Sequence, residues 1–303
     1  MTQLSELFDL HHHVAVVTGG AGLLGAEFCK TLAEAGAQVV VADLNEAAAI
    51  HLADTLNIQG LSALGVGTDV RSTDSVHKLV ASTLDAYGGL DILVNSAALD
   101  PKFDPRHQGE GIKGLTESDS PNPYPSSPNS LTFENYPINL WKQALDVNLT
   151  GMFLCCQAAA RSMLAQGAGK GGLRPTDQHG GVIINICSMY GLVGPDQRLY
   201  QREDQPPQYK PVYYSVTKAG VLGLTRYLAT YYAGKNIRVN ALTPGGVYNG
   251  HDEEFLRAYS ARSVLGRMAR KDEMNGALLF LASDASSYMT GANLVVDGGW
   301  TAW

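Results

Sequence analysis

The stretch Val14–Gly25, which reads VAVVTGGAGLLG, decides the fold of this chain of 303 residues. It opens with an apolar, β-branched run that is typical of a buried parallel strand. A helical pattern over residues 26–35 follows its glycines. The glycines allow a tight turn and a close approach to a pyrophosphate, which the amides at the start of a helix can bind. The stretch therefore predicts a strand–turn–helix unit that binds a dinucleotide.

An acidic residue closes the next strand. Residues 38–42 read as a second β-strand, and Asp43 follows it. An acid about 20 residues beyond the glycine turn can bind the adenosine ribose hydroxyls. A carboxylate at this place would repel a 2′-phosphate, and Leu44 and Asn45 offer no cation to offset that repulsion. We therefore expect NAD rather than NADP as the cofactor.

Alternating strand and helix patterns continue along the chain. Further strands are predicted at 61–67, 90–94, 182–186, 237–241 and 293–296, and further helices at 46–57, 73–86, 140–166, 213–233, 252–262 and 271–283. Strands that alternate with helices form a parallel sheet covered on both faces. We predict an α/β protein with a Rossmann-type, doubly wound, seven-stranded parallel sheet, in which residues 1–303 form a single domain.

The composition fits a globular enzyme-sized unit, with 45% hydrophobic and 17% charged residues. The net charge of −7, without any run of lysine or arginine, argues against a nucleic-acid or anionic-membrane partner. The chain shows no leader pattern and no apolar stretch of the ~18 residues that a membrane span needs. Its four cysteines lie in apolar stretches without metal-ligand spacing. We expect a cytoplasmic protein with reduced thiols and no metal site, in which His11–His13 is a native turn.

Two segments, 99–139 and 191–211, interrupt the alternation. Both follow strands at their carboxyl ends, where open α/β sheets bind ligands. We expect them to wall a substrate pocket, with a floppy surface excursion as the alternative for the first. Their cations would suit a carboxylate or a phosphate, although each alone also fits a solvated surface charge. These cations, with two from a later segment, are Lys102, Arg106, His107, Arg198, Arg202, Lys210, His251 and Arg257.

Tyr214 and Lys218 lie four residues apart in a predicted helix, so their side chains share one face. A free tyrosine has a pKa near ~10, and a nearby cation favours its ionised form. Acid–base catalysis is efficient when that pKa is close to the working pH. The alternative is an amphipathic helix whose tyrosine packs and whose lysine is solvated.

Taken in chain order, the motifs resemble the short-chain dehydrogenase/reductase family over essentially the whole chain. The matching motifs are Thr18–Gly25, Asp69-Val70, Asn95–Ala98, Asn148, Ser188, Tyr214-x-x-x-Lys218, Pro244-Gly245 and Asp297–Gly299. The resemblance implies a catalytic role for Tyr214, which would exchange a proton with the substrate oxygen while Ser188 orients that oxygen. It also implies that Lys218 holds the nicotinamide ribose and favours the tyrosinate, and that Asn148 anchors a water chain.

The resemblance, with the patterns above, also assigns the cofactor contacts. They are Gly19, Gly22, Leu23, Leu24, Gly25, Asp43, Leu44, Asp69, Val70, Asn95, Ala97, Tyr214, Lys218, Pro244, Gly245 and Val247. Asp69 would accept a hydrogen bond from the adenine amine, unless it only caps its loop. Three positions depart from the family pattern: Leu23 replaces a usual glycine, residues 95–98 read NSAA instead of NNAG, and Asn249 stands where a threonine is frequent.

The glycine loop and the long excursions are similar to those of reductases near gluconate 5-dehydrogenase and of bacterial sialic-acid-like sugar pathways. This similarity implies a secondary alcohol or ketone on a sugar or sugar acid. Apolar 3-oxoacyl or steroid-like ketones are alternative substrates, and a non-catalytic dinucleotide-binding regulator is the alternative function. The family also implies a homotetramer or a homodimer. We expect the terminal residues 300–303, WTAW, to be exposed and to reach a neighbouring subunit, so that truncation after Gly299 weakens assembly or activity.

Overall fold

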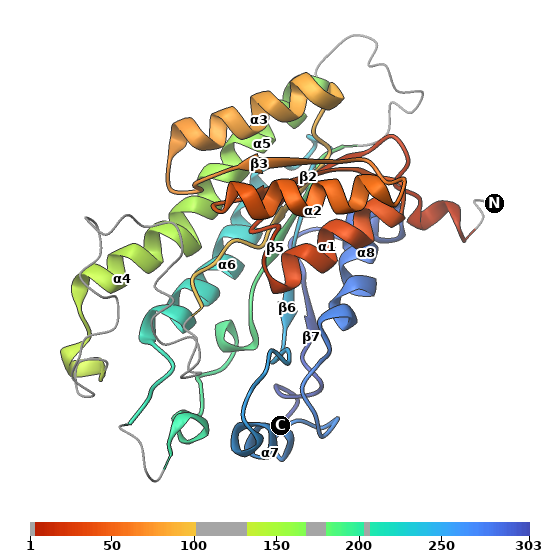
Figure 1. Ribbon diagram of the computed structural model, residues 1–303. Helices are drawn as coiled ribbons and strands as arrows, with labels where there is room; N and C mark the ends of the chain where they lie inside the picture. The colour runs from red at the N-terminus through yellow and green to blue at the C-terminus, as the bar shows by residue number, and fades with distance from the viewer. Residues whose placement is uncertain (1–3, 101–131, 168–179, 203–206) are drawn as a thin grey trace.

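The computed structural model describes residues 4–100, 132–167, 180–202 and 207–303 (Figure 1). Seven parallel strands form one sheet in the order β3-β2-β1-β4-β5-β6-β7. They are β1 (Val14–Thr18), β2 (Gln38–Asp43), β3 (Ala63–Gly67), β4 (Ile92–Asn95), β5 (Val182–Ile186), β6 (Arg238–Pro244) and β7 (Asn293–Val296). The strand order reverses between β1 and β4, and α/β sheets bind their ligands at such a reversal. The predicted Rossmann-type sheet is confirmed, and each strand lies within three residues of its expected bounds.

Helices cover both faces of the sheet (Figure 1). One apolar core joins the sheet to α3 (Thr73–Tyr87), α5 (Met152–Gly167) and α6 (Val212–Tyr231). A second core joins it to α1 (Leu23–Glu34), α2 (Glu46–Ile58) and α8 (Asn275–Ala282). Every residue of β1, β4 and β5 is buried, as expected for parallel strands that are covered on both faces.

The region predicted as one helix over residues 140–166 has three parts. It consists of α4 (Ile138–Leu145), a π-helical turn (Asp146–Gly151) and α5. The expectation of an unbroken helix was therefore wrong. A π turn adds one residue to the helical register and is frequent at functional sites. The candidate catalytic residue Asn148 lies in this turn.

Shorter elements complete the chain. The helix α7 (Glu253–Ser260) lies near the C-terminus at one end of the molecule (Figure 1). Single 3-10 turns occur at Glu6–Phe8, Phe133–Asn135, Met189–Gly191, Gln197–Tyr200, Lys271–Met274 and Asp284–Ser286. The helix predicted at 271–283 is thus a 3-10 turn followed by α8, and α1 begins three residues earlier than predicted.

A third, aromatic cluster lies beyond the carboxyl ends of the strands and includes Tyr214, Phe255, Tyr259 and Trp300. The rings of Tyr259 and Trp300 stack with 4.5 Å between their centroids. Trp300 is only 8% exposed, whereas Trp303 is 80% exposed. The expectation that both tryptophans are exposed is therefore wrong for Trp300, whose indole belongs to the core of its own chain. Truncation after Gly299 would remove that core residue as well as any contact with a neighbour.

The four cysteines are buried as free thiols, as predicted. Burial raises the pKa of the Cys155 thiol to about 12, so this thiol stays protonated at neutral pH. No helix in the described part of the chain is both long and apolar enough to cross a membrane.

Gly25 is a position where the fold admits no side chain. A Cβ atom there would overlap the carbonyl oxygen of Gly19, which belongs to the same turn. We expect Gly25→Ala to lower the free energy of unfolding by about 2–4 kcal/mol, because the turn must open to relieve this clash. Gly223→Ala is the matched control, since a Cβ at this mid-helix position of α6 meets no atom within 4 Å. It should raise the free energy of unfolding by about 0.5–1 kcal/mol. Urea unfolding followed by far-ultraviolet circular dichroism measures both, and equal losses in the two variants would contradict the assignment.

Candidate active site

A cavity of about 1350 Å³ opens at the carboxyl ends of the strands. It runs from the glycine turn after β1, past the ends of β4 and β5, to α6 and α7. Its volume exceeds the roughly 300–1,000 Å³ of an ordinary ligand site, which leaves room for two ligands side by side. Of the residues predicted to contact a cofactor, all except Asn95 line this cavity, and Ser188 lines it too.

The glycine turn gives the cavity a backbone floor. Gly19 has φ of 63°, and a Cβ on it would lie 2.8 Å from the Cα of Ala97, in the loop after β4. The two loops can approach this closely only because neither carries a large side chain there. The first amides of α1, from Leu23 onward, have no partner within their own helix and point to this floor. Such a cradle fits the phosphates of a dinucleotide.

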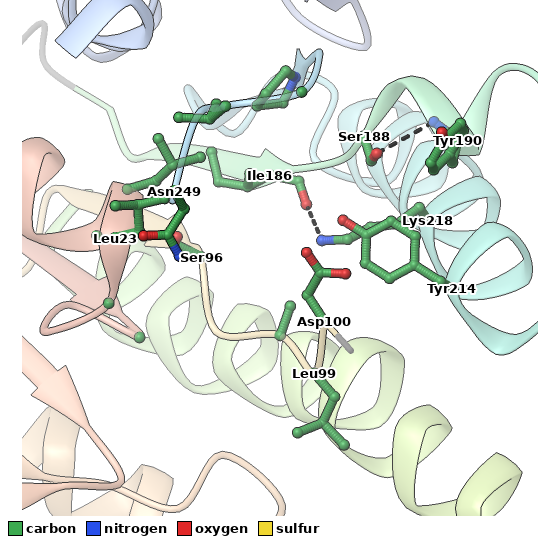
Figure 2. A pocket seen from close by; sticks show the side chains of 18 of the residues that line it. Leu23, Ser96, Leu99, Asp100, Ile186, Ser188, Tyr190, Tyr214, Lys218 and Asn249 are labelled. Atoms are coloured by element: carbon green, nitrogen blue, oxygen red, sulfur yellow. Dashed lines mark hydrogen bonds between the residues drawn. The ribbon is translucent and has the colours of Figure 1, made fainter. Parts of the chain in front are cut away.

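Leu23 departs from the family pattern without filling the cradle. It is the first residue of α1, and its side chain is 40% exposed at the cavity wall (Figure 2). The tight part of the turn is Gly22, whose N–H donates to the carbonyl oxygen of Gly19 at 3.0 Å. A Cβ on Gly22 would approach that same oxygen to 3.1 Å. The glycine that this chain has one position early therefore stands where the backbone needs it.

The carboxylate of Asp43 is fixed at one end of the cavity. Its Oδ2 accepts a hydrogen bond from the Ala21 N–H at 3.1 Å, and its Oδ1 accepts one from the Asn45 N–H at 3.0 Å. These bonds hold the negative charge against the glycine turn. A carboxylate in this position can accept from the two hydroxyls of a ribose and opposes a phosphate on it.

Asp69 also lines the cavity, but its side chain already has a partner. The guanidinium of Arg71 donates to both carboxylate oxygens, with an Nη2–Oδ2 distance of 2.7 Å. This hydrogen-bonded cation lowers the pKa of the Asp69 carboxyl. A contact from Asp69 to an adenine amine therefore remains a prediction, and it would have to use the acceptor capacity that Arg71 leaves.

The side chain of Asn95 does not face the cavity, so the predicted cofactor contact of this residue could come only from its backbone and stays a prediction. Asn95 is 2% exposed, and its Nδ2 donates to Asn185 Oδ1 at 2.9 Å. Asn185 in turn donates to Thr225 Oγ1 at 3.0 Å. The amide of Asn95 therefore links β4 to β5 and, through Asn185, to α6. Its oxygen Oδ1 has no hydrogen-bond partner in the structure.

Tyr214, Ser188 and Lys218 meet at the inner wall of the cavity (Figure 2). The side chains of Tyr214 and Ser188 both line this part of the cavity. The ammonium Nζ of Lys218 lies 5.8 Å from the centroid of the Tyr214 ring and donates to the carbonyl oxygen of Ile186 at 2.9 Å. Ser188 Oγ also accepts from the Tyr190 N–H at 3.2 Å, which fixes its rotamer. Three of the four predicted catalytic residues thus share one small volume.

Electrostatics around Tyr214 differ from the expectation. Burial, and then the negative charge of Asp100, raise the pKa of Tyr214 well above its ordinary value, and the nearby Ser188 side chain lowers it only in part. Burial also lowers the pKa of Lys218. Figure 2 shows the Asp100 carboxylate pointing toward Tyr214 and Lys218. Burial is the largest of these influences on the pKa of Tyr214, and the role expected of Lys218 in favouring the tyrosinate stays a prediction.

Asn148 lies outside the cavity lining and has all its amide groups engaged. Its Oδ1 accepts from the Leu99 N–H at 2.7 Å, and its Nδ2 donates to Leu99 O and to Thr217 Oγ1, each at 3.2 Å. It is 1% exposed. Its effect on the site passes through the loop after β4 and through α6, so the geometry makes it a positioning residue. The water chain that the resemblance implies for Asn148 stays a prediction.

Lys210 is one of the cations for which the sequence left open a place beside the substrate or a solvated surface position. It is 8% exposed, and its Nζ lies 2.5 Å from Asp100 Oδ1 and 4.1 Å from the centroid of the Tyr214 ring. The reading of this lysine as a solvated surface charge was therefore wrong. Its position four residues before Tyr214 was the one feature of the sequence that could have indicated its place beside that residue. Arg198, by contrast, has an 80% exposed side chain and fits that reading.

The excursion 191–211 forms part of the cavity wall, as expected. Arg202 Nη2 donates to both carboxylate oxygens of Asp252, at 2.8 and 3.0 Å, and this ties the excursion to the start of α7. The Tyr200 hydroxyl donates to the Tyr190 hydroxyl at 3.0 Å, and the Tyr200 ring packs 5.7 Å from the Phe255 ring. The segment 99–139 cannot be judged in the same way, since residues 101–131, with Lys102, Arg106 and His107, lie outside the described part of the chain.

Comparisons with known proteins agree with this geometry. A family model described as short chain dehydrogenase matches residues 13–259. The cis-4-hydroxycyclohexanecarboxylate dehydrogenase of Sinomonas cyclohexanicum is 36% identical over 293 residues, which cover 95% of this chain and 96% of that protein. The D-threitol dehydrogenase of Mycolicibacterium smegmatis is 32% identical over 311 residues, which cover 99% of each chain. The crystal structure of a gluconate 5-dehydrogenase from Burkholderia cenocepacia, in complex with NADP and tartrate, has a TM-score of 0.75 and 28% identity, and the match covers 99% of this chain and 100% of that one.

Proposed function

This chain belongs to the short-chain dehydrogenase family, and on that premise we propose that it is an NAD-dependent oxidoreductase of secondary alcohols and ketones on cyclic or sugar-like molecules. The observation that carries the proposal is the placement of the Tyr214 hydroxyl. It lies with Ser188 and Lys218 in the same cavity as the glycine cradle after β1. A module that only bound a dinucleotide would have no use for this acid–base group.

A nicotinamide dinucleotide on the glycine cradle would supply the hydride acceptor for oxidation and the hydride donor for reduction. The protein's own part is proton transfer and orientation. In oxidation, Tyr214 takes the proton from the substrate hydroxyl as a general base, and in reduction it returns a proton to the carbonyl oxygen. The hydroxyl of Ser188 holds that oxygen in place, which fixes the carbinol carbon for transfer. Lys218, buried and cationic, stabilises the phenolate that forms on Tyr214.

The outer part of the cavity supports a cyclic or sugar-like substrate. Aromatic side chains line it, among them those of Tyr190, Tyr200 and Phe255. Lys210 and Arg202 add charge to the same wall. A compact ring with polar groups suits such a wall better than a long acyl chain or a steroid, because an apolar ligand would displace water from these charged groups without offering them a hydrogen bond. A sugar, a sugar acid or a related ring alcohol is therefore the proposed substrate.

The choice of NAD rests on Asp43. Its carboxylate is held at the glycine turn, and a 2′-phosphate on the ribose would meet that charge. A similar gluconate 5-dehydrogenase was crystallised with NADP, so the preference for NAD is proposed here from Asp43 and not from that relative. The buried free thiols support a cytoplasmic location. Exposed aromatic rings at Phe153, Tyr227 and Tyr231 on α5 and α6 support assembly into a homotetramer or a homodimer.

Tyr214→Phe tests the proposed acid–base role. We expect it to reduce kcat for NAD-dependent oxidation of ring alcohols and polyols by about 10²–10⁴-fold, because the general base is lost. Tyr227→Phe, on the same helix but 62% exposed, is the control and should turn over like the wild type. Formation of NADH, followed by its absorbance across a panel of polyols, sugar acids and cyclohexanols, measures the effect. Equal turnover by wild type and Tyr214→Phe would contradict the mechanism.

Asp43→Asn tests the cofactor preference. The wild type should show a higher kcat/KM with NAD than with NADP, and removal of the carboxylate should shift that ratio toward NADP by about tenfold or more, because a repulsive charge is lost. Asp54→Asn, an exposed position on α2, changes the net charge equally and should leave the ratio unchanged. A wild-type preference for NADP, or equal ratios in both variants, would refute the role given to Asp43.

The charges near Tyr214 predict opposite shifts in the pH profile of oxidation. Oxidation needs the phenolate, so kcat rises as the pH passes the pKa of Tyr214, which the negative charge of Asp100 raises. Asp100→Asn removes that charge and should move the rise to lower pH. Lys210→Met leaves the Asp100 charge without its partner and should move the rise to higher pH. Profiles of kcat against pH at saturating substrate check both, and shifts in the same direction would show that these two charges do not act on Tyr214.

A further inference from the structure

Lys210 occupies a fixed position beside Tyr214. Gln197 holds its backbone on both sides, since Gln197 Oε1 accepts from the Lys210 N–H at 2.8 Å and Gln197 Nε2 donates to the Lys210 carbonyl at 3.1 Å. Pro211 then caps α6, and its carbonyl accepts from the Tyr214 N–H at 3.1 Å. The backbone of Lys210 is therefore fixed by the Gln197 side chain, and the Pro211–Tyr214 hydrogen bond fixes the start of α6 that follows it.

The ammonium of Lys210 faces the cavity between two aromatic rings. Its Nζ lies 4.1 Å from the centroid of Tyr214 and 6.0 Å from that of Tyr190. With its side chain 8% exposed, this cation has lost most of its hydration and needs a negative partner. Asp100 supplies that partner at 2.5 Å.

The two members of this ion pair are held very differently. The side chain of Lys210 is 8% exposed, whereas that of Asp100 is 56% exposed. A fixed, buried cation thus binds a carboxylate that comes from the open side of the cavity. Another carboxylate could take the place of Asp100 at little cost, because Asp100 can return to water while Lys210 stays paired.

We propose that Lys210 is the residue that selects the substrate, by binding a carboxylate carried by the alcohol that Tyr214 oxidises. The substrate is then a hydroxy acid rather than a neutral polyol. The position of the Asp100 carboxylate defines a carboxylate seat beside Lys210 Nζ. It shows which chemical group this lysine binds and where that group lies. The inference rests on the proposed function, and it adds the charged group that the substrate must carry besides its hydroxyl.

A permanent ion pair between Lys210 and Asp100 is the competing explanation. In that case both residues would serve the fold, and loss of either would reduce stability and turnover of every substrate alike. Under our proposal Asp100 competes with the substrate carboxylate. Its removal should therefore improve binding of a hydroxy acid, and this gain is the outcome that a structural ion pair cannot produce.

The kinetic test compares two matched alcohols, cis-4-hydroxycyclohexanecarboxylate and its neutral carboxamide. The wild type should prefer the acid, and Lys210→Met should reduce the ratio of kcat/KM between acid and amide by about 10- to 100-fold, the usual effect of losing a hydrogen bond to a charged group. Asp100→Asn should lower KM for the acid several-fold. Lys78→Met, an exposed position on α3 away from the cavity, removes the same charge and should leave the ratio unchanged.

A binding test separates this inference from the proposed function. Cyclohexanecarboxylate carries no hydroxyl and cannot react, so its effect on the melting temperature in the presence of NAD does not depend on turnover. We expect it to raise the melting temperature of the wild type and of Asp100→Asn, with no rise in Lys210→Met, whereas cyclohexanecarboxamide should raise none of them. Absence of turnover with both alcohols, together with this binding pattern, would refute the proposed substrate reaction but retain the carboxylate seat. Equal effects of Lys210→Met on acid and amide, or equal melting shifts with both cyclohexane probes, would overturn the inference.

Discussion

The substrate end of the cavity depends on one constraint, which is that charged side chains are buried around the phenol of Tyr214. Two lysines lie close to Tyr214, and both are nearly inaccessible to water, with Lys210 8% and Lys218 4% exposed. A buried ammonium is unfavourable unless hydrogen bonds and opposite charge replace its hydration. Lys218 obtains a carbonyl oxygen from Ile186, at the end of β5, and Lys210 obtains the carboxylate of Asp100, beyond the end of β4. The ends of two neighbouring strands therefore supply the polar partners of both lysines.

One amide fixes the backbone beside the Asp100 side chain. Asn148, in the π turn between α4 and α5, bonds the N–H and the carbonyl of Leu99. Leu99 directly precedes Asp100, so these bonds position the backbone from which the Asp100 side chain extends. The same Asn148 donates to Thr217, the neighbour of Lys218. A single buried side chain outside the cavity thus links the loop after β4 to the turn of α6 that carries Thr217 and Lys218.

Features that depend on local backbone geometry could be predicted from the sequence, whereas contacts between side chains of distant segments could not. The sheet and the glycine cradle were predictable because apolar runs and glycines determine local backbone geometry, as at Gly19 and Gly25. The π turn was not, because one additional residue barely disturbs a helical pattern. Side-chain direction was equally hidden: Asn95 carries a family motif, yet its amide faces β5 and not the cavity. The burial of Lys210 depends on Asp100, 110 residues earlier in the chain, and no local pattern reports such a contact.

The two ends of the cavity are formed by different kinds of atoms, and this difference bears on how substrate specificity arises. At the cofactor end, backbone atoms of the glycine turn and the first amides of α1 form the surface, so few side-chain changes would alter it. At the substrate end, side chains from separate segments form the surface, with Asp100 after β4, Lys210 before α6 and Phe255 on α7. Under the proposed function, substitution there would change which alcohol fits without altering the cofactor end. Proteins that match nearly the whole of this chain indeed differ in the alcohols for which they are named. In this chain the most deeply buried charge among those outer residues is an ammonium, and a cation held that firmly beside the reacting group favours an anion over any neutral ligand of the same shape.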